Sequence, residues 1–126
     1  MVQVVHYPLF AFVGNDRYVE YQTRHQKLTT LVVGPAMLIE AFTTVLIAWY
    51  PPPGVSVGFI LGGIFLLFII WISTAAVQVP CHGKLARGFD AKTLRILVSS
   101  NWIRTIAWSA RGALMAWLLM LVLASN

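Results

Sequence analysis

Three long apolar stretches dominate the pattern of the chain, and short polar or proline-rich segments separate them. These stretches are Leu28–Tyr50, Val55–Val79 and Trp102–Ala124. A hydrocarbon core of about 30 Å takes about 20 helical residues to cross, so each stretch is long enough to span a membrane. The sequence therefore predicts three membrane-spanning helices, with the first two joined by a tight turn at "PPPG", residues 51–54.

The opening stretch, residues 1–14, is also apolar. At about 1.5 Å per residue it reaches only ~21 Å as a helix, which predicts a fourth span that is short or incomplete at its N-terminus. We therefore predict an all-α fold, a transmembrane four-helix bundle that forms one domain over residues 1–126. Asp90 is placed to cap a helix from about residue 91 that runs into the last span, and "DRYVEYQTRHQKL" extends the second span in the same way.

Composition supports a membrane protein. Apolar residues make up 59% of the chain and charged residues only 10%, against roughly 25% charged in soluble domains. The single cysteine, Cys81, excludes an internal disulfide and a multi-cysteine metal cage, and we predict no metal site. The expected partners are membrane lipids and other membrane protein subunits, with no nucleic acid.

The basic residues predict the orientation. Segment 15–27 holds three of them and segment 80–101 holds four, whereas the 51–54 turn and the C-terminal tail hold none. Short loops rich in lysine and arginine stay on the cytoplasmic side. The sequence thus predicts a bacterial inner-membrane protein with loops 15–27 and 80–101 in the cytoplasm, and with the turn and C-terminus outside.

A few charged residues interrupt the apolar spans. Glu40 lies inside "LVVGPAMLIEAF", and Arg104 and Arg111 lie on the last span. Counted from the cytoplasmic ends of their helices, Glu40 is roughly 20 Å deep and Arg111 about 15 Å deep. An isolated charge at the bilayer centre costs about 2.5–3.5 kcal/mol, so Glu40 and Arg111 are predicted to face inward and pair. His6 is expected near the same depth.

Other polar residues are predicted to gather near this pair. Asn101 and Trp108 share a stripe with both arginines, at spacings of three and four residues. Tyr21 and His25, and likewise Gln78 and His82, are expected to line the cytoplasmic mouth. The cluster fits either a structural ion pair that fixes helix register or a polar pocket for a ligand or cofactor.

Two histidines on different helices are suited to bind a tetrapyrrole or a metal, but the chain has no HExxH, Glu-x-x-His or CxxCH motif. Hydrogen-bonded histidines at the interface are therefore the favoured interpretation. A tetrapyrrole or a quinone stays compatible with the pocket, and the cofactor is left unassigned. The glycines at 58, 62 and 63 are predicted to permit close helix packing.

The segments "VHYPLFAFVG", "YQTRHQKLTTLVVGPAMLIE", "STAAVQVPCHGKL" and "LVSSNWIRTIAWSAR" resemble a family of small four-helix bacterial membrane proteins without a settled function. That family is similar in turn to four-helix membrane proteins of the anthrone oxygenase-like set. The distinctive shared elements are Tyr21, His25, Pro35, Glu40, Pro80, His82, Asn101 and Arg104. The resemblance implies the four-helix fold. The wider set often has a histidine where this chain has Trp102.

Three functions are compatible with this reading. The favoured one is an accessory or structural subunit of a respiratory or photosynthetic membrane complex, holding a pigment, quinone or lipid. The second is a cofactor-independent, oxygenase-like enzyme for a hydrophobic aromatic or quinone-like substrate, with His25 or His82 as base and Arg104 or Arg111 stabilising an oxyanion. A transporter or channel ranks last, because the chain shows no pair of broken helices in matching halves.

Overall fold

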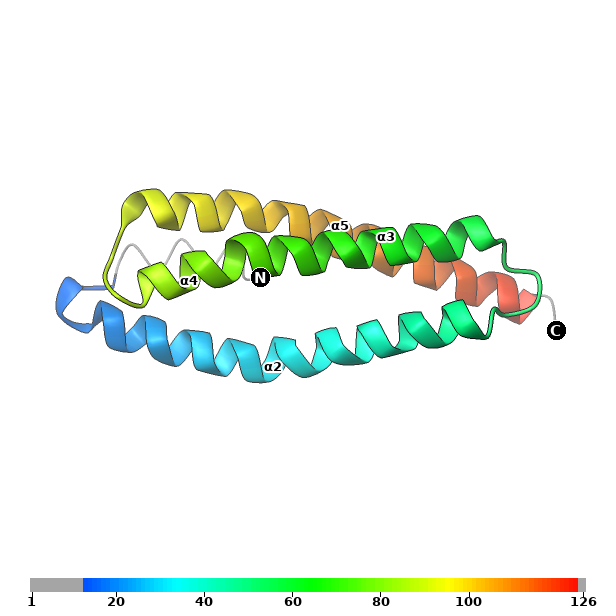
Figure 1. Ribbon diagram of the computed structural model, residues 1–126, viewed down its shortest axis with the longest axis horizontal. Helices are drawn as coiled ribbons and strands as arrows, with labels where there is room; N and C mark the ends of the chain where they lie inside the picture. The colour runs from blue at the N-terminus through cyan, green and yellow to red at the C-terminus, as the bar shows by residue number, and fades with distance from the viewer. Residues whose placement is uncertain (1–12, 125–126) are drawn as a thin grey trace.

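The computed structural model describes residues 13–124, and within that range it contains helices and no strand. In chain order the elements are α2 (Asn15–Trp49), α3 (Val57–Ser73), the π-helix η3 (Thr74–Gln78), α4 (Val79–Leu85) and α5 (Ala91–Ala124), as Figure 1 shows. Three helical segments, Arg17–Trp49, Val57–Leu85 and Ala91–Ala124, are long and apolar enough to cross a membrane. The all-α fold and the three apolar spans are confirmed. The predicted partial span at 1–14 falls almost wholly outside the described residues.

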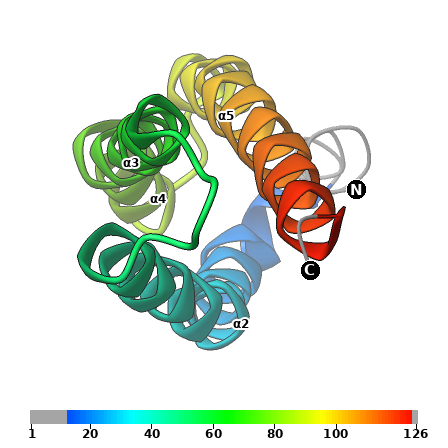
Figure 2. The same cartoon turned by 90° about the vertical axis from the view of Figure 1, so that its right-hand side faces the viewer.

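The helices run alongside one another. α3, η3 and α4 form one nearly continuous rod, and α5 packs against α3 more closely than α2 does. Viewed along the long axis, α2, the α3–α4 rod and α5 occupy three corners of the bundle (Figure 2). Two small groups of buried apolar residues hold the bundle together. One centres on Leu85 and Leu97 and the other on Met37 and Ile70.

α2 is longer than the predicted span, because the polar segment before Leu28 is helical from Asn15 onward. The predicted extension is confirmed, so segment 15–27 is helix and not loop. Pro35 lies inside α2, has no N–H to donate to the carbonyl of Leu31, and crowds that carbonyl with its ring. α2 accordingly bows away from its neighbours in its middle part (Figure 1).

The third span was predicted to end at Val79, before Pro80, and this boundary is wrong. The rod continues to Leu85 through η3, in which the N–H of Val79 reaches the carbonyl of Thr74, five residues back. The wider π turn keeps the ring of Pro80 clear of the carbonyl that a proline normally strikes in an α-helix. Segment 80–101 is consequently helical apart from residues 86–90.

α5 begins at Ala91, as predicted. Asp90 caps it, because its Oδ2 accepts the N–H of Thr93 at 3.2 Å and also the hydroxyl of that residue. The ammonium group of Lys84 lies 2.9 Å from the same oxygen. The hydrogen bonds from Thr93 and Lys84 hold the pKa of Asp90 well below its usual range. The predicted turn at 51–54 is also present, and Gly54 closes it with a φ of 77°.

Candidate functional site

Among the described residues the most buried charged group is the guanidinium of Arg111, whose side chain is only 5% exposed. Its Nε donates to Oε1 of Glu40 at 2.6 Å. Its Nη2 donates to the hydroxyl of Thr44 and its Nη1 to the carbonyl of Gly63. Glu40 and Thr44 belong to α2 and Gly63 to α3. One side chain of α5 therefore connects α2, the α3–α4 rod and α5.

Gly63 makes that contact possible. A Cβ at this position would lie 3.2 Å from Nη1 of Arg111 and 3.2 Å from Cε of Met115. By contrast, the nearest atom to a Cβ at Gly62 is 4.0 Å away, on Leu114, and at Gly58 it is 3.7 Å away, on Ser56. Of the three glycines predicted to permit close packing, only Gly63 is in a tight approach.

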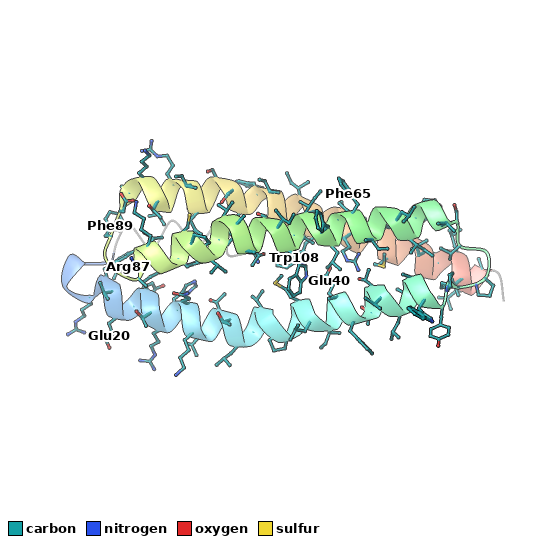
Figure 3. All side chains as sticks on the ribbon, viewed as in Figure 1. Glu20, Glu40, Phe65, Arg87, Phe89 and Trp108 are labelled. Carbon is teal, nitrogen blue, oxygen red and sulfur yellow. The ribbon has the colours of Figure 1, made fainter. Side chains whose placement is uncertain are left out.

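Trp108 connects Glu40 to the second arginine of α5. Its Nε1 donates to Oε2 of Glu40 at 3.1 Å, so each carboxylate oxygen has a donor. The guanidinium carbon of Arg104 lies 4.7 Å from the centroid of the Trp108 ring, in cation–π geometry. Glu40 and Trp108 lie between α2 and the other helices (Figure 3). Glu40 therefore both neutralises Arg111 and fixes the ring beneath Arg104.

A second polar group lies nearer the α4 end. Nε2 of Gln22 is 2.9 Å from Nδ1 of His82, and the ring centroids of His25 and His82 are 6.0 Å apart. The hydroxyl of Thr29 lies 3.3 Å from Nε2 of His25, and the ring of Tyr21 stacks on His25 at 6.3 Å. The predicted residues Tyr21, His25 and His82 thus lie together.

The other predicted residues lie close to these groups. Gln78 is buried and donates to the hydroxyl of Ser100 at 3.0 Å. Asn101 is buried on α5, and its carbonyl accepts the hydroxyl of Thr105. His6 lies outside the described residues.

A cavity of about 200 Å³ separates α2 from η3 and α4. Its polar lining comes from all three rods and consists of Gln26, Thr29, Thr30, Thr74, Gln78, His82 and Arg104. Its apolar lining consists of Val33, Gly34, Met37 and Val79. The lining includes Gly34 and Met37, which flank Pro35 in the sequence, and Thr74 and Gln78 of η3, so two departures from regular helix geometry border the cavity. Such π turns are frequent at functional sites.

Two residues of the site, Gln22 and Thr44, were not predicted from the sequence, and Gly63 was predicted only as a packing glycine. Gln22, Thr44 and Gly63 supply direct partners to His82 and Arg111. Spacing could have found two of them, since Gln22 is three residues from His25 and Thr44 four residues from Glu40 on the same helix. No pattern marks the carbonyl of Gly63 as an acceptor.

The cavity suits an organic head group better than a large cofactor. Ligand pockets for drug-sized molecules have about 300–1,000 Å³, so a volume of about 200 Å³ favours a single ring or head group over a tetrapyrrole. Within the described part of the chain, no three His, Cys, Asp or Glu side chains are grouped to hold a metal ion.

Comparison with known proteins gives no relative: the chain matches no family model, no curated protein and no solved structure. The function is therefore argued from the geometry of the site.

Proposed function

We propose that this chain is an accessory subunit of a larger redox or photosynthetic complex in the bacterial inner membrane, and that it holds the head group of an amphipathic molecule such as a quinone, pigment or lipid. The observation that carries the proposal is the cavity between α2 and η3–α4. It combines a buried cation, Arg104, with an apolar wall in a molecule that exposes many large apolar side chains along its helices.

The exposed apolar residues support a membrane subunit. Large side chains such as Leu31, Phe42, Phe65, Ile106 and Leu119 point outward along every long helix. The non-helical connections between the described helices are short, the longer one being residues 50–56. Nothing in residues 13–124 forms a domain outside the spans, so partners would be recognised through helix faces.

The proposal includes the orientation and the fourth helix. The basic residues of segments 15–27 and 80–101 belong to the start of α2, to α4, to the connection after α4 and to the start of α5. These parts of the chain meet at one end of the molecule (Figure 1). The rule that positive residues stay inside supports a cytoplasmic position for this end. Residues 1–14 would supply the fourth helix, in keeping with the resemblance to small four-helix bacterial membrane proteins.

Purification from native membranes in a mild detergent tests the proposal. We expect the wild-type protein to carry companion subunits and an organic ligand, detected by mass spectrometry and an absorption spectrum. Gly34 lines the cavity, and a Cβ there would meet nothing within 4 Å, so Gly34→Leu should fill the cavity and expel the ligand. Gly112 is exposed on α5, and Gly112→Leu is the matched control. A stable, unliganded wild-type monomer would overturn the proposal.

One observation favours the oxygenase-like alternative: His82 and Arg104 line the same cavity. In this alternative, His82 accepts a phenolic proton, Arg104 stabilises the resulting oxyanion, and molecular oxygen then oxidises the anion. Arg111 is not among the residues that line the cavity, since its guanidinium is bound to Glu40, Thr44 and Gly63. Turnover of an aromatic substrate by the wild type, lost in His82→Ala while the protein still inserts, would favour the enzyme over the subunit.

A further inference from the structure

We infer that the cavity selects a membrane-soluble molecule with an acidic hydroxyl or carboxyl group, and that Arg104 binds this group as its anion. The inference rests on the proposed function, because it names the class of ligand that the cavity between α2 and η3–α4 would hold.

The lining of the cavity is positively charged at one point, Arg104, and this charge favours an anionic ligand. Among the described residues that line the cavity, Arg104 is the one permanent cation and there is no carboxylate. The closest carboxylate described above, Glu40, accepts hydrogen bonds from Nε of Arg111 and Nε1 of Trp108. A charge in such a poorly solvated place acts strongly on a ligand, because the local dielectric constant is far below that of water.

Arg104 is held in one position. It is only 8% exposed, and its guanidinium lies over the Trp108 ring. That ring is in turn held by Glu40. A guanidinium that is already oriented can donate hydrogen bonds to two oxygens of one group. This geometry favours a carboxylate or a hydroxyquinone anion.

Two threonines of the lining, Thr30 and Thr74, cannot donate a hydrogen bond to a ligand. The hydroxyl of Thr30 donates to the carbonyl of Gln26 at 2.8 Å, and that of Thr74 donates to the carbonyl of Ile70 at 2.7 Å. Both hydroxyl hydrogens are used within their own helices, so these residues offer the cavity only acceptor oxygens. The lining keeps neutral donors in its amides and in His82, and Arg104 is its permanently charged donor for a ligand oxygen.

The rim indicates how such a molecule reaches the site. Thr30 and Val79 are exposed at the edge of the cavity, on α2 and α4, and Val33, Gly34 and Met37 form an apolar wall behind them. This edge faces sideways from the bundle, where lipid would lie. A ligand with an acidic head and an apolar tail can slide in from the bilayer, with its tail left between α2 and α4.

The full chain in lipid nanodiscs, titrated with two matched probes, tests the inference. One probe is a 2-hydroxy-1,4-naphthoquinone with a long 3-alkyl chain, and the other is its neutral methyl ether. Binding is followed by quenching of tryptophan fluorescence, which Trp108 beside Arg104 should report. In Gly34→Leu the cavity is filled, so the quenching that remains comes from probe dissolved in the lipid. Gly112→Leu is the control for adding a leucine elsewhere.

We expect the wild type to bind the acidic probe at least about tenfold more tightly than the ether. Arg104→Gln should weaken the acidic probe about tenfold and leave the ether unchanged, which also shows that the cavity is intact, whereas Arg104→Lys should keep most of the preference. Displacement of the acidic probe by oleate would extend the class to fatty acids, and no displacement would restrict it to acidic ring hydroxyls.

Two results distinguish failure of the inferred anion preference from failure of the proposed function. If both probes bind equally and Arg104→Gln changes nothing, but Gly34→Leu abolishes binding, the cavity holds a ligand and the inferred anion preference is wrong. If neither probe shows saturable binding that Gly34→Leu removes, and native purification yields no ligand, the proposed function fails with it.

Discussion

Nε of Arg111 lies 2.6 Å from Oε1 of Glu40, although the two residues are 71 positions apart in the chain. The same guanidinium reaches Gly63 of α3. A carboxylate in an apolar helix is thereby matched by a cation that contacts both other rods. The pair also orients Trp108, and through it Arg104, so the ion pair is physically linked to the wall of the cavity.

Glu40→Gln should destabilise the protein strongly, because it leaves the charge of Arg111 buried without its counter-ion. Breaking one side of a buried pair costs about 3–5 kcal/mol in the free energy of unfolding. Unfolding by SDS titration from mixed micelles measures this. The double variant Glu40→Met with Arg111→Met should recover part of the loss, since neither charge is then left alone.

Glu20 is an exposed carboxylate on the same helix, and Glu20→Gln is the matched control. It should stay within about 0.5 kcal/mol of the wild type. Equal stability of Glu40→Gln and Glu20→Gln would show that the ion pair contributes nothing to the fold.

Gly63→Ala and Gly62→Ala form a second test, with neighbouring glycines in different surroundings. A methyl group at Gly63 would press on Arg111 and Met115 at 3.2 Å, so we expect a loss of about 1–3 kcal/mol by overpacking. At Gly62 the nearest atom is 4.0 Å away, and alanine should be neutral or slightly stabilising because it favours helix. Thermal unfolding in detergent measures both, and the reverse order would contradict the packing at Gly63.

Trp108→Phe tests whether the indole N–H holds Glu40. Phenylalanine keeps an aromatic ring for Arg104 but removes the donor to Oε2 of Glu40, so we expect a loss of about 1–3 kcal/mol. Trp117 is half exposed on the same helix, and Trp117→Phe should have little effect. A comparable loss in both variants would mean that ring size, and not the hydrogen bond, matters.

The cap at Asp90 should make stability depend on pH. The folded-state pKa of Asp90 lies below its ordinary value of about 3.9, so the contribution of its carboxylate is complete above that value. It is lost as the pH falls below it and the carboxylate becomes protonated. The melting temperature should therefore drop more between about pH 6 and about pH 3 in the wild type than in Asp90→Asn. Equal drops would show that this carboxylate does not stabilise the start of α5.

The sequence was sufficient for the parts that depend on helix length and depth. Leu28–Tyr50 and Trp102–Ala124 could be recognised because an apolar run of that length has few other uses. Depth along each helix also set Glu40 and Arg111 at similar levels, where the structure brings them together. Asp90 predicted the start of α5, because an N-cap hydrogen bond involves only residues close in the sequence.

The cavity could not be predicted in this way, because it depends on how helices deviate from regular geometry. The apolar stretch was predicted to end at Val79, whereas the helix continues past Pro80 through the π turn at Thr74–Gln78. Arg104 and Arg111 are seven residues apart on one stripe, and spacing alone does not decide which of them reaches Glu40. The structure pairs Arg111 with Glu40 and places Arg104 over the Trp108 ring, an arrangement that depends on how the helices pack.

The contacts of Arg111 constrain the order in which the protein can be built. Chains are synthesised from the N-terminus, so α5 is made after α2 and α3. It carries two arginines, and it is the least hydrophobic of the three candidate spans. Its guanidinium finds compensation only where Glu40, Thr44 and the Gly63 carbonyl already stand side by side. We therefore expect α2 and α3 to act as a template onto which α5 docks.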